Sequence, residues 1–239
     1  MRPKVAQPFP LSKLMDPQVD FPLLAKELRV VEAYDALRDQ HPLRAWEYAM
    51  AHKAIGDWQE ARDATPMAAL EGTLDPLQLC DVGGAGSRFY HSLLAVTSED
   101  IWVIDPAAPP DPAHGQWQIY QGTVESFAAT NRHNQFDALT CISVIEHVPN
   151  LRAFFRACHM LLKPGGLLFL TTDCWNCEGP DTAHFHWMRE RIYNPGSLQK
   201  LTGSLRELGF KSFGASDWAY KGDHLYGSYS FASIAMVRG

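Results

Sequence analysis

The sequence predicts an α/β fold, because strand and helix signals alternate along the chain. Apolar segments typical of buried strands alternate with segments of helical periodicity. One strand runs directly into a glycine-rich turn at residues 83–86, and acidic residues stand at the ends of the first two strands. At 239 residues and 46% hydrophobic, the chain is long enough for one such domain with an appendage.

The amino-terminal quarter of the chain predicts a helical extension, residues 1–75, that precedes the main domain at residues 76–239. Helical periodicity and prolines define its parts. The expected parts are an irregular segment at 1–15, a helix at 17–39, a helix at 42–55 ended by Gly56-Asp57, a short helix at 58–64, and a linker at 65–76.

The first strand, residues 77–82, leads into the glycine-rich turn. Glycines there let the backbone approach a ligand closely, because no Cβ intervenes. The dinucleotide pattern G-x-G-x-x-G fits in neither register, since its last glycine would fall on Phe89 or Arg88. A P-loop is excluded because no Lys followed by Ser or Thr closes the turn. The pattern that fits is acid-x-Gly-x-small-x-small, formed by Asp81, Gly83, Ala85 and Ser87.

The second strand, residues 101–104, ends at Asp105. A carboxylate about 20 residues beyond the first strand is placed to accept hydrogen bonds from ribose hydroxyls, although a solvated loop acid is the alternative. A third strand is expected at 117–120, followed by the turn at 122–125.

The most specific pattern is FDALTCISVIEHVPNLRAFFRACHMLLKPGGLLFLTT at residues 136–172. Strand and capping signals there and beyond define the remaining elements. They are a strand at 138–144, the pair Glu146-His147, a helix from Pro149-Asn150 to the glycines at 165–166, a strand at 167–172, a long loop at 173–195, a helix from 194–197 to Gly209, and strands at 210–218 and 229–237. Loops of that length are commonly functional.

Together, the strings DVGGAGS, SVIEHV and LLKPGG resemble the class I S-adenosylmethionine (SAM) dependent methyltransferases over residues 77–238. The family's first motif is D-x-G-x-G-x-G, in which Ala85 and Ser87 replace two glycines here. The similarity is to the small-molecule branch, which includes ubiquinone, menaquinone and sugar methyltransferases. It implies a Rossmann-like, seven-stranded, mostly parallel sheet in order 3-2-1-4-5-7-6, with helices on both faces and an antiparallel last strand, and SAM as cofactor.

The resemblance also implies the residues that bind the cofactor. Val124 and Glu125 are expected beside the adenine. The backbone at Ala85 and Ser87 is expected beside the methionine part, without positive φ. The full expected set is Asp81, Gly83, Gly84, Ala85, Gly86, Asp105, Pro106, Val124, Glu125 and Ser143.

Methyl transfer from a sulfonium depends on positioning and, for a hydroxyl acceptor, on deprotonation. His147 is the expected general base because imidazole titrates near neutral pH, with a helix cap or a turn brace as the alternative. Glu146 is expected to orient a neighbour, and His186 is a second candidate base. The acceptor is expected to be a small molecule methylated on O or N. The residues expected to contact it, unless they only pack, are Arg44, Trp46, Tyr48, His184 and Trp187.

A metal is not expected. Some ubiquinone-pathway enzymes read E-x-x-E-H and hold a divalent ion there, but the first position is Ser143 in this chain, although His184 or His186 could substitute. The five cysteines fit a reducing compartment without a disulfide framework. A zinc site formed by Cys174, Cys177, His184 and His186 is conceivable, but these residues do not have the spacing of a zinc finger.

Charge and composition restrict the partners. A net charge of -6 provides no general basic field for nucleic acid, and the motifs of DNA methyltransferases are missing after the fourth strand. No apolar run reaches the length of a membrane span, and a signal-peptide core is lacking, so a cytoplasmic protein is expected. The helical extension is expected either as a substrate lid, as the family often uses it, or as packing or a homodimer contact. A non-catalytic binding subunit with a methyltransferase-like fold is the alternative function.

Overall fold

One mixed sheet organises the part of the chain that the structure describes. The computed structural model describes residues 9–34, 44–64, 76–87, 89–97, 99, 101–108, 117–175, 192–219 and 229–239. Its strands are β1 (Ser12–Leu14), β2 (Leu79–Val82), β3 (Ile101–Asp105), β4 (Trp117–Gln121), β5 (Phe136–Ile142), β6 (Leu162–Trp175), β7 (Phe210–Ser212), β8 (Ser216–Asp217) and β9 (Tyr229–Arg238). Its helices are α1 (Pro17–Leu23), α2 (Ala25–Ala33), α3 (Arg44–Asp63), α5 (Phe89–Ser92), α6 (Val124–Ala128), α7 (Leu151–Leu161) and α8 (Pro195–Glu207). The short 3-10 turns are η1 (Gly84–Gly86), η2 (Leu93–Ala95) and η3 (Ile145–His147).

The strand order is β4-β3-β2-β5-β6-β9-β1-β8, with β7 also paired to β9. Strands β4, β3, β2, β5 and β6 pair in parallel, and β9 runs antiparallel to β6 and β7. The expected α/β fold and its seven-strand order are therefore confirmed. The short strand β1 was not expected, and β8 was expected only as the end of a continuous strand at 210–218. Both short strands extend the sheet beyond β9.

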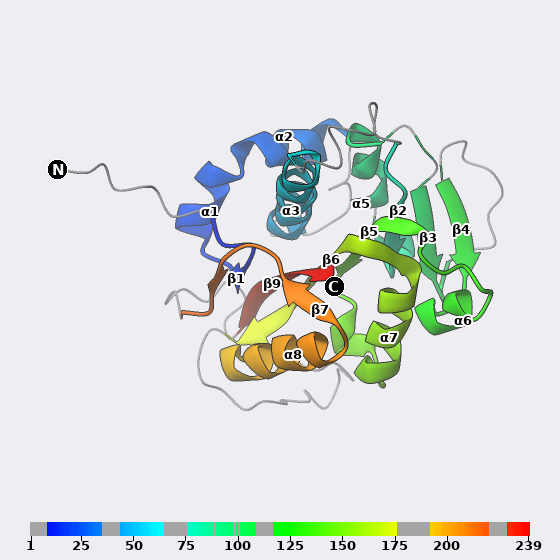
Figure 1. Cartoon of the computed structure of the whole chain (residues 1–239). Coiled ribbons are helices and arrows are strands. Elements are labelled where there is room, and N and C mark those ends of the chain that lie inside the picture. The colour runs from blue at the N-terminus through cyan, green and yellow to red at the C-terminus, as the bar shows by residue number, and fades with distance from the viewer. Residues whose placement is uncertain are drawn as a thin grey trace.

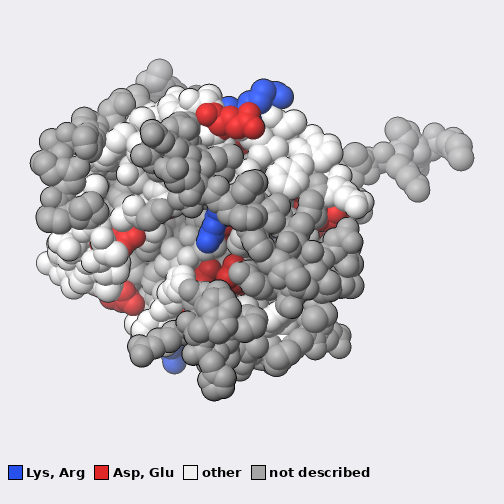
Figure 2. All heavy atoms as spheres, turned by 180° about the vertical axis from the view of Figure 1, so that it is seen from behind, with Lys and Arg blue, Asp and Glu red and all other residues white. Residues whose placement is uncertain are grey.

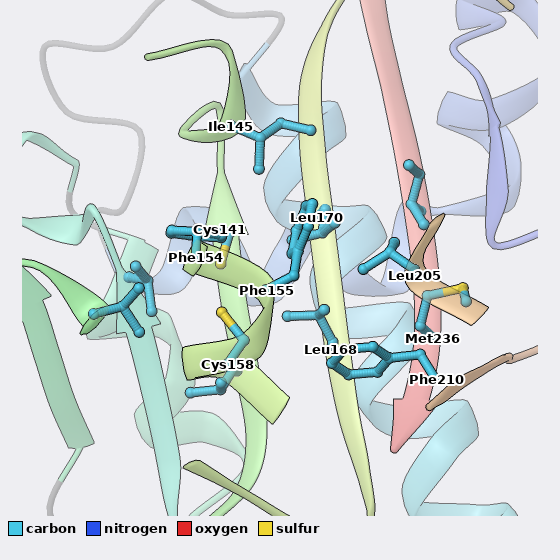
Figure 3. Packing of buried hydrophobic residues seen from close by; sticks show 14 of the residues in the cluster. Cys141, Ile145, Phe154, Phe155, Cys158, Leu168, Leu170, Leu205, Phe210 and Met236 are labelled. Carbon is cyan, nitrogen blue, oxygen red and sulfur yellow. The ribbon is translucent and has the colours of Figure 1, made fainter. Parts of the chain in front are cut away.

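Side chains of the central strands alternate between two cores. Leu168 and Leu170 of β6 belong to the core beneath α7 and α8, whereas Leu167 and Phe169 belong to the core beneath α3. Figure 1 shows α3 on one side of the sheet and α7 with α8 on the other. In Figure 3, Leu168 and Leu170 pack beside Phe155 of α7. Both faces are buried, as continuous apolar strands predict.

The amino-terminal helices differ from the expected boundaries. The helix expected at 17–39 is interrupted at Leu24, whose backbone leaves helical geometry (φ -97°, ψ 12°) while its side chain is fully buried. The helix end expected at Gly56 was wrong, because α3 continues to Asp63. Trp58, two residues later, is buried, and Lys53 pairs with Asp57 at 2.8 Å across the glycine. No described helix, α3 included, is long and apolar enough to cross a membrane.

Two tryptophans fix α3 to the rest of the structure. Near its start, the indole N–H of Trp46 donates to the carboxylate of Asp20 at 2.8 Å, and Asp20 is ion-paired with the buried Lys13 of β1. Near its end, the indole N–H of Trp58 donates to the carbonyl of Gly165 at 2.9 Å. The described part of residues 1–75 is thus joined to the sheet near both ends of α3, at Lys13 of β1 and at Gly165 of β6. The domain boundary at residue 75 and the lid role stay predictions.

Boundaries in the carboxyl-terminal half follow local signals. The Asn150 side chain caps α7 by accepting from Ala153 N at 3.1 Å, and Asn194 forms a capping box with Ser197 at α8, as expected. The strand expected at 210–218 is divided into β7 and β8, because Gly214 takes a positive φ of 71° between them. Strand β6 continues to Trp175, into the segment expected as a loop.

Replacing Gly56 with alanine should raise the free energy of unfolding by about 0.5–1 kcal/mol, because glycine is the poorer residue inside a helix. A Cβ at this position would meet nothing within 4 Å. Urea unfolding of both proteins measures the difference. The matched control is Gly166→Ala, which should be destabilising because its Cβ would crowd the carbonyl oxygens of Lys163 at 2.9 Å and Asp137 at 3.0 Å. A Gly56→Ala protein less stable than wild type would contradict the prediction.

Candidate functional site

The glycine-rich turn lies at the carboxyl edge of the sheet, where β2 ends. Gly83 has a φ of 79° and is followed by η1. A Cβ at Gly83 would overlap the side chain of Val144, so this turn and the turn after β5 are in direct contact. Among the described non-glycine residues, positive φ occurs at Asn131, Asn134 and Ser143, and not at Ala85 or Ser87. The expected backbone conformation at the two substituted positions is confirmed.

Asp81 lies beneath this turn and is only 1% exposed. One carboxylate oxygen accepts a hydrogen bond from the Thr140 hydroxyl at 2.8 Å. The other oxygen has no hydrogen-bond partner among the described residues, and it lies where a Cβ of Gly84 would be. Burial is the main cause that raises the pKa of Asp81 to about 7; the Thr140 hydrogen bond opposes this rise and the nearby Asp105 adds to it. A ligand that binds at the glycine-rich turn could donate the hydrogen bond that this buried oxygen does not receive from the described residues.

A cavity of about 440 Å³ opens beside the turn. Its walls come from the ends of β2 and β3, from the start of α6, and from η3 and α7. They are lined by Val82, Gly83, Ile104, Pro106, Gly122, Thr123, Val124, Glu125, Val144, His147, Val148, Pro149, Asn150, Ala153 and Phe154. The volume and the mostly apolar lining suit a planar organic ring. The structure therefore brings together five residues expected from the sequence, namely Gly83, Pro106, Val124, Glu125 and His147.

Asp105 connects the end of β3 to the glycine-rich turn. One carboxylate oxygen accepts from Ala85 N at 3.0 Å and the other from Ala107 N at 2.7 Å. The side chain is 7% exposed and lies beside the cavity-lining Pro106. Asp105 thus sits at the expected edge, where it also supports the turn itself.

Next to the cavity, three described polar residues form hydrogen bonds with Glu47 of α3. No role was expected for Glu47 from the sequence. Its side chain is fully buried. One oxygen accepts from Ser143 Oγ at 2.7 Å and from Thr171 Oγ1 at 2.5 Å, and the other accepts from Arg44 Nη1 at 2.7 Å. Arg44 also donates to Ser143. The sequence signal was an Arg-Glu pair three positions apart within an otherwise apolar helical stretch.

Arg44 is partly accessible, with 32% of its side chain exposed. Burial alone would lower the pKa of its guanidinium, but the ion pair and hydrogen bond with Glu47 and the nearby Asp173 raise it above its ordinary value. The guanidinium also lies over the ring of Phe231, 5.4 Å from its centroid. Arg44 is therefore a fixed cation near the carboxyl ends of β5 and β6.

Glu146 and His147 differ in their surroundings. Glu146 is 5% exposed and accepts from Thr172 Oγ1 at 3.0 Å. Burial raises the pKa of its carboxyl well above the ordinary value, and the nearby Asp173 adds to this. His147 is exposed at the rim of the cavity. The structure therefore places a buried carboxyl with a raised pKa beside an imidazole open to solvent.

The remaining expected contacts lie in different places. Trp46 is fully buried and bonded to Asp20, which favours packing over contact with an acceptor. Tyr48 packs on Phe89 with ring centroids 5.1 Å apart, and its hydroxyl is buried with Ser87 nearby. Burial raises the pKa of Tyr48 well above its usual range, and Glu47 adds to the rise.

Part of the expected site lies outside the described residues. This applies to Cys177, His184, His186 and Trp187. Within the described ranges, no group of three or more His, Cys, Asp or Glu side chains is arranged to hold a metal ion. On the face in Figure 2, the coloured Lys and Arg atoms are few and scattered, so its described part carries no broad basic patch.

Comparisons with known proteins agree with this geometry. A family model described as a methyltransferase domain matches residues 50–212. A ubiquinone biosynthesis O-methyltransferase of Pseudomonas aeruginosa (strain UCBPP-PA14) is 31% identical over 96 residues, which cover 37% of this chain and 41% of the relative. The chain thus spans less than half the length of that relative.

Two solved structures show the same fold at low sequence identity. The [4+2]-cyclase SpnF has a TM-score of 0.55 at 15% identity, over 89% of this chain and 96% of that one. The Burkholderia thailandensis 1,6-didemethyltoxoflavin-N1-methyltransferase, with bound 1,6-didemethyltoxoflavin and S-adenosylhomocysteine (SAH), has a TM-score of 0.51 at 15% identity. That match covers 94% of this chain and 93% of the other.

The buried Asp81 predicts a pH-dependent stability difference between wild type and Asp81→Asn. Because the folded pKa of about 7 lies above the ordinary value of 3.8, the folded state binds the proton more tightly than the unfolded state. The stability that Asp81 contributes is present below pH 4 and is lost as the pH rises through 7. The free energy of unfolding of Asp81→Asn, relative to wild type, should therefore increase from pH 4 to 7 and then level off. A flat difference in urea unfolding across that range would refute the assignment.

Proposed function

The chain belongs to the class I SAM-dependent methyltransferase family, and from that premise we propose that it transfers a methyl group from SAM to an O or N atom of a small molecule. The observation that carries the proposal is the apolar cavity at the carboxyl edge of the sheet, flanked by the glycine-rich turn over Asp81. In open parallel sheets, ligands bind at this edge, where the strand order reverses.

The residues around the cavity fit the parts of SAM. We assign the adenine to the apolar slot beside Val124 and Glu125, with Pro106 on its wall. Asp105, at the end of β3, would accept hydrogen bonds from the ribose. The methionine part would lie along residues 83–86, where glycines admit close backbone contact, and near the unpartnered oxygen of Asp81.

The bound cofactor would supply an electrophilic methyl group on a positively charged sulfur. The work of this chain is then to hold and orient the reactants and to exclude water. We propose His147 as the group that accepts a proton from the acceptor, since it is exposed at the rim of the cavity. Glu146, buried and bonded to Thr172, would orient its surroundings rather than act as the base.

Among the described residues, the proposed contacts with the methyl acceptor lie on α3, at and beside the polar cluster that Glu47 forms with residues of β6 and of the turn after β5. Arg44 offers a fixed and partly exposed cation, and Tyr48 offers a buried hydroxyl. We propose both for acceptor or cofactor contact, with Trp46 supporting them from the core. His184, His186 and Trp187 remain proposed contacts. The negative net charge supports a small molecule over nucleic acid. A cytoplasmic location and homodimer formation also stay proposals.

Isothermal titration with SAM and SAH should give binding in the micromolar range for the wild-type protein. Asp105→Ala should weaken SAH binding by about 1–3 kcal/mol, the loss typical of hydrogen bonds to a charged group. Asp105→Asn keeps an acceptor oxygen and should lose less. Absence of SAM and SAH binding by the wild type would refute the proposal.

The matched control is Asp137→Ala at the opposite edge of the sheet. Asp137 also accepts from a backbone amide, Gln78 N at 2.8 Å. This variant should reduce stability without changing the SAH dissociation constant. Equal losses of affinity in Asp105→Ala and Asp137→Ala would mean that Asp105 acts through stability alone.

A further inference from the structure

Glu47 is a buried carboxylate whose partners come from three separate parts of the chain. It joins Arg44 of its own helix to Ser143 after β5 and to Thr171 of β6. Ser143 and Thr171 are also joined directly, because Ser143 N donates to Thr171 Oγ1 at 3.1 Å and to the Thr171 carbonyl at 3.2 Å. The carboxylate therefore fixes α3 onto the carboxyl edge of the sheet.

The partner that matters most is Ser143, because its backbone is in the left-handed region, with φ at 50°. Residues other than Gly, Asn and Asp rarely adopt this conformation, and it persists only where surrounding contacts enforce it. The Ser143 hydroxyl donates to Glu47, and the backbone N–H donates to Thr171. Glu47 thus supplies a contact that can hold the unfavourable turn.

The turn at Ser143 decides where the next residues lie. Val144 follows directly, touches the position of Gly83 in the glycine-rich turn, and lines the cavity. η3 begins one residue later and ends at His147, which lies on the cavity rim. A change of φ at Ser143 would move one wall of the cavity and the imidazole together.

We propose that Glu47 is a positioning residue, which shapes the cofactor cavity by holding Ser143 in its left-handed conformation. This inference rests on the proposed function, since it treats the cavity as the SAM site. Glu47 itself touches no open part of the cavity, because its side chain is fully buried and both carboxylate oxygens are hydrogen-bonded. Its effect on cofactor binding must therefore pass through a partner, and Ser143 is the partner whose backbone leads directly to the cavity wall.

The chain offers a matched control in Asp20. Asp20 is also a fully buried carboxylate that fixes α3, through Trp46 at 2.8 Å, and it too has a basic partner, Lys13. Its contacts involve neither Ser143 nor the cavity. Glu47→Gln and Asp20→Asn are therefore the same chemical change on two attachments of one helix.

The first experiment measures SAH affinity by isothermal titration, and amide hydrogen exchange over residues 139–150, in wild type and both variants. Glu47→Gln should weaken SAH binding about tenfold, which corresponds to about 1.4 kcal/mol, and should increase exchange at 143–148. Asp20→Asn should lower the melting temperature and leave the SAH affinity and this exchange unchanged. Equal SAH affinity in Glu47→Gln and wild type would overturn the role of Glu47 alone. No binding by wild type would overturn it together with the proposed function.

The second experiment tests whether Glu47 acts through Ser143. Glycine adopts positive φ without strain, so Ser143→Gly removes the need for a contact that holds the turn. In a Ser143→Gly background, Glu47→Gln should change SAH affinity by less than about twofold, against about tenfold in the wild-type background. Ser143→Ala keeps the Cβ but removes the hydroxyl that Glu47 holds, so by itself it should weaken SAH binding about tenfold, and Glu47→Gln should add little to that loss. An equal loss from Glu47→Gln in the wild-type and Ser143→Gly backgrounds would show that Glu47 acts by another route.

Discussion

β2 and β5 run side by side in parallel, with Asp81 opposite Thr140 and Val82 opposite Cys141. The two strands end at the same edge, so the turns that follow them, at Gly83 and at Ser143, must meet. They do so through Val144, which occupies the space that a Cβ of Gly83 would need. The cavity, the buried Asp81 and the exposed His147 all derive their positions from this contact between two turns.

The edge holds two environments that differ in polarity. On one side, apolar residues such as Ile104 and Phe154 line a cavity. On the other, Glu47 gathers a guanidinium and two hydroxyls in a buried group. Buried charges persist when they are paired and hydrogen-bonded, as Glu47 is. A ligand with a flat apolar end and a charged end would match this division.

Much of the fold could be predicted because its signals are local. Asn150 and Asn194 begin helices through their own side chains, and the carboxylates at Asp81 and Asp105 directly mark the ends of strands. The helix end expected at Gly56 failed for a tertiary reason. Gly56 weakens the helix locally, but the burial of Trp58 against the sheet outweighs that preference.

The sequence by itself determined the order of elements, the glycine-rich turn and the candidate residues along the cavity, because each depends on neighbours within a few positions. It could not identify Glu47, whose partners at Ser143 and Thr171 are 96 and 124 residues away. Nor could it separate Trp46 in the core from Arg44 at the surface, since both lie on one helical segment. Only the tertiary structure decided these matters, because it brings distant residues into contact and determines which side chains meet solvent.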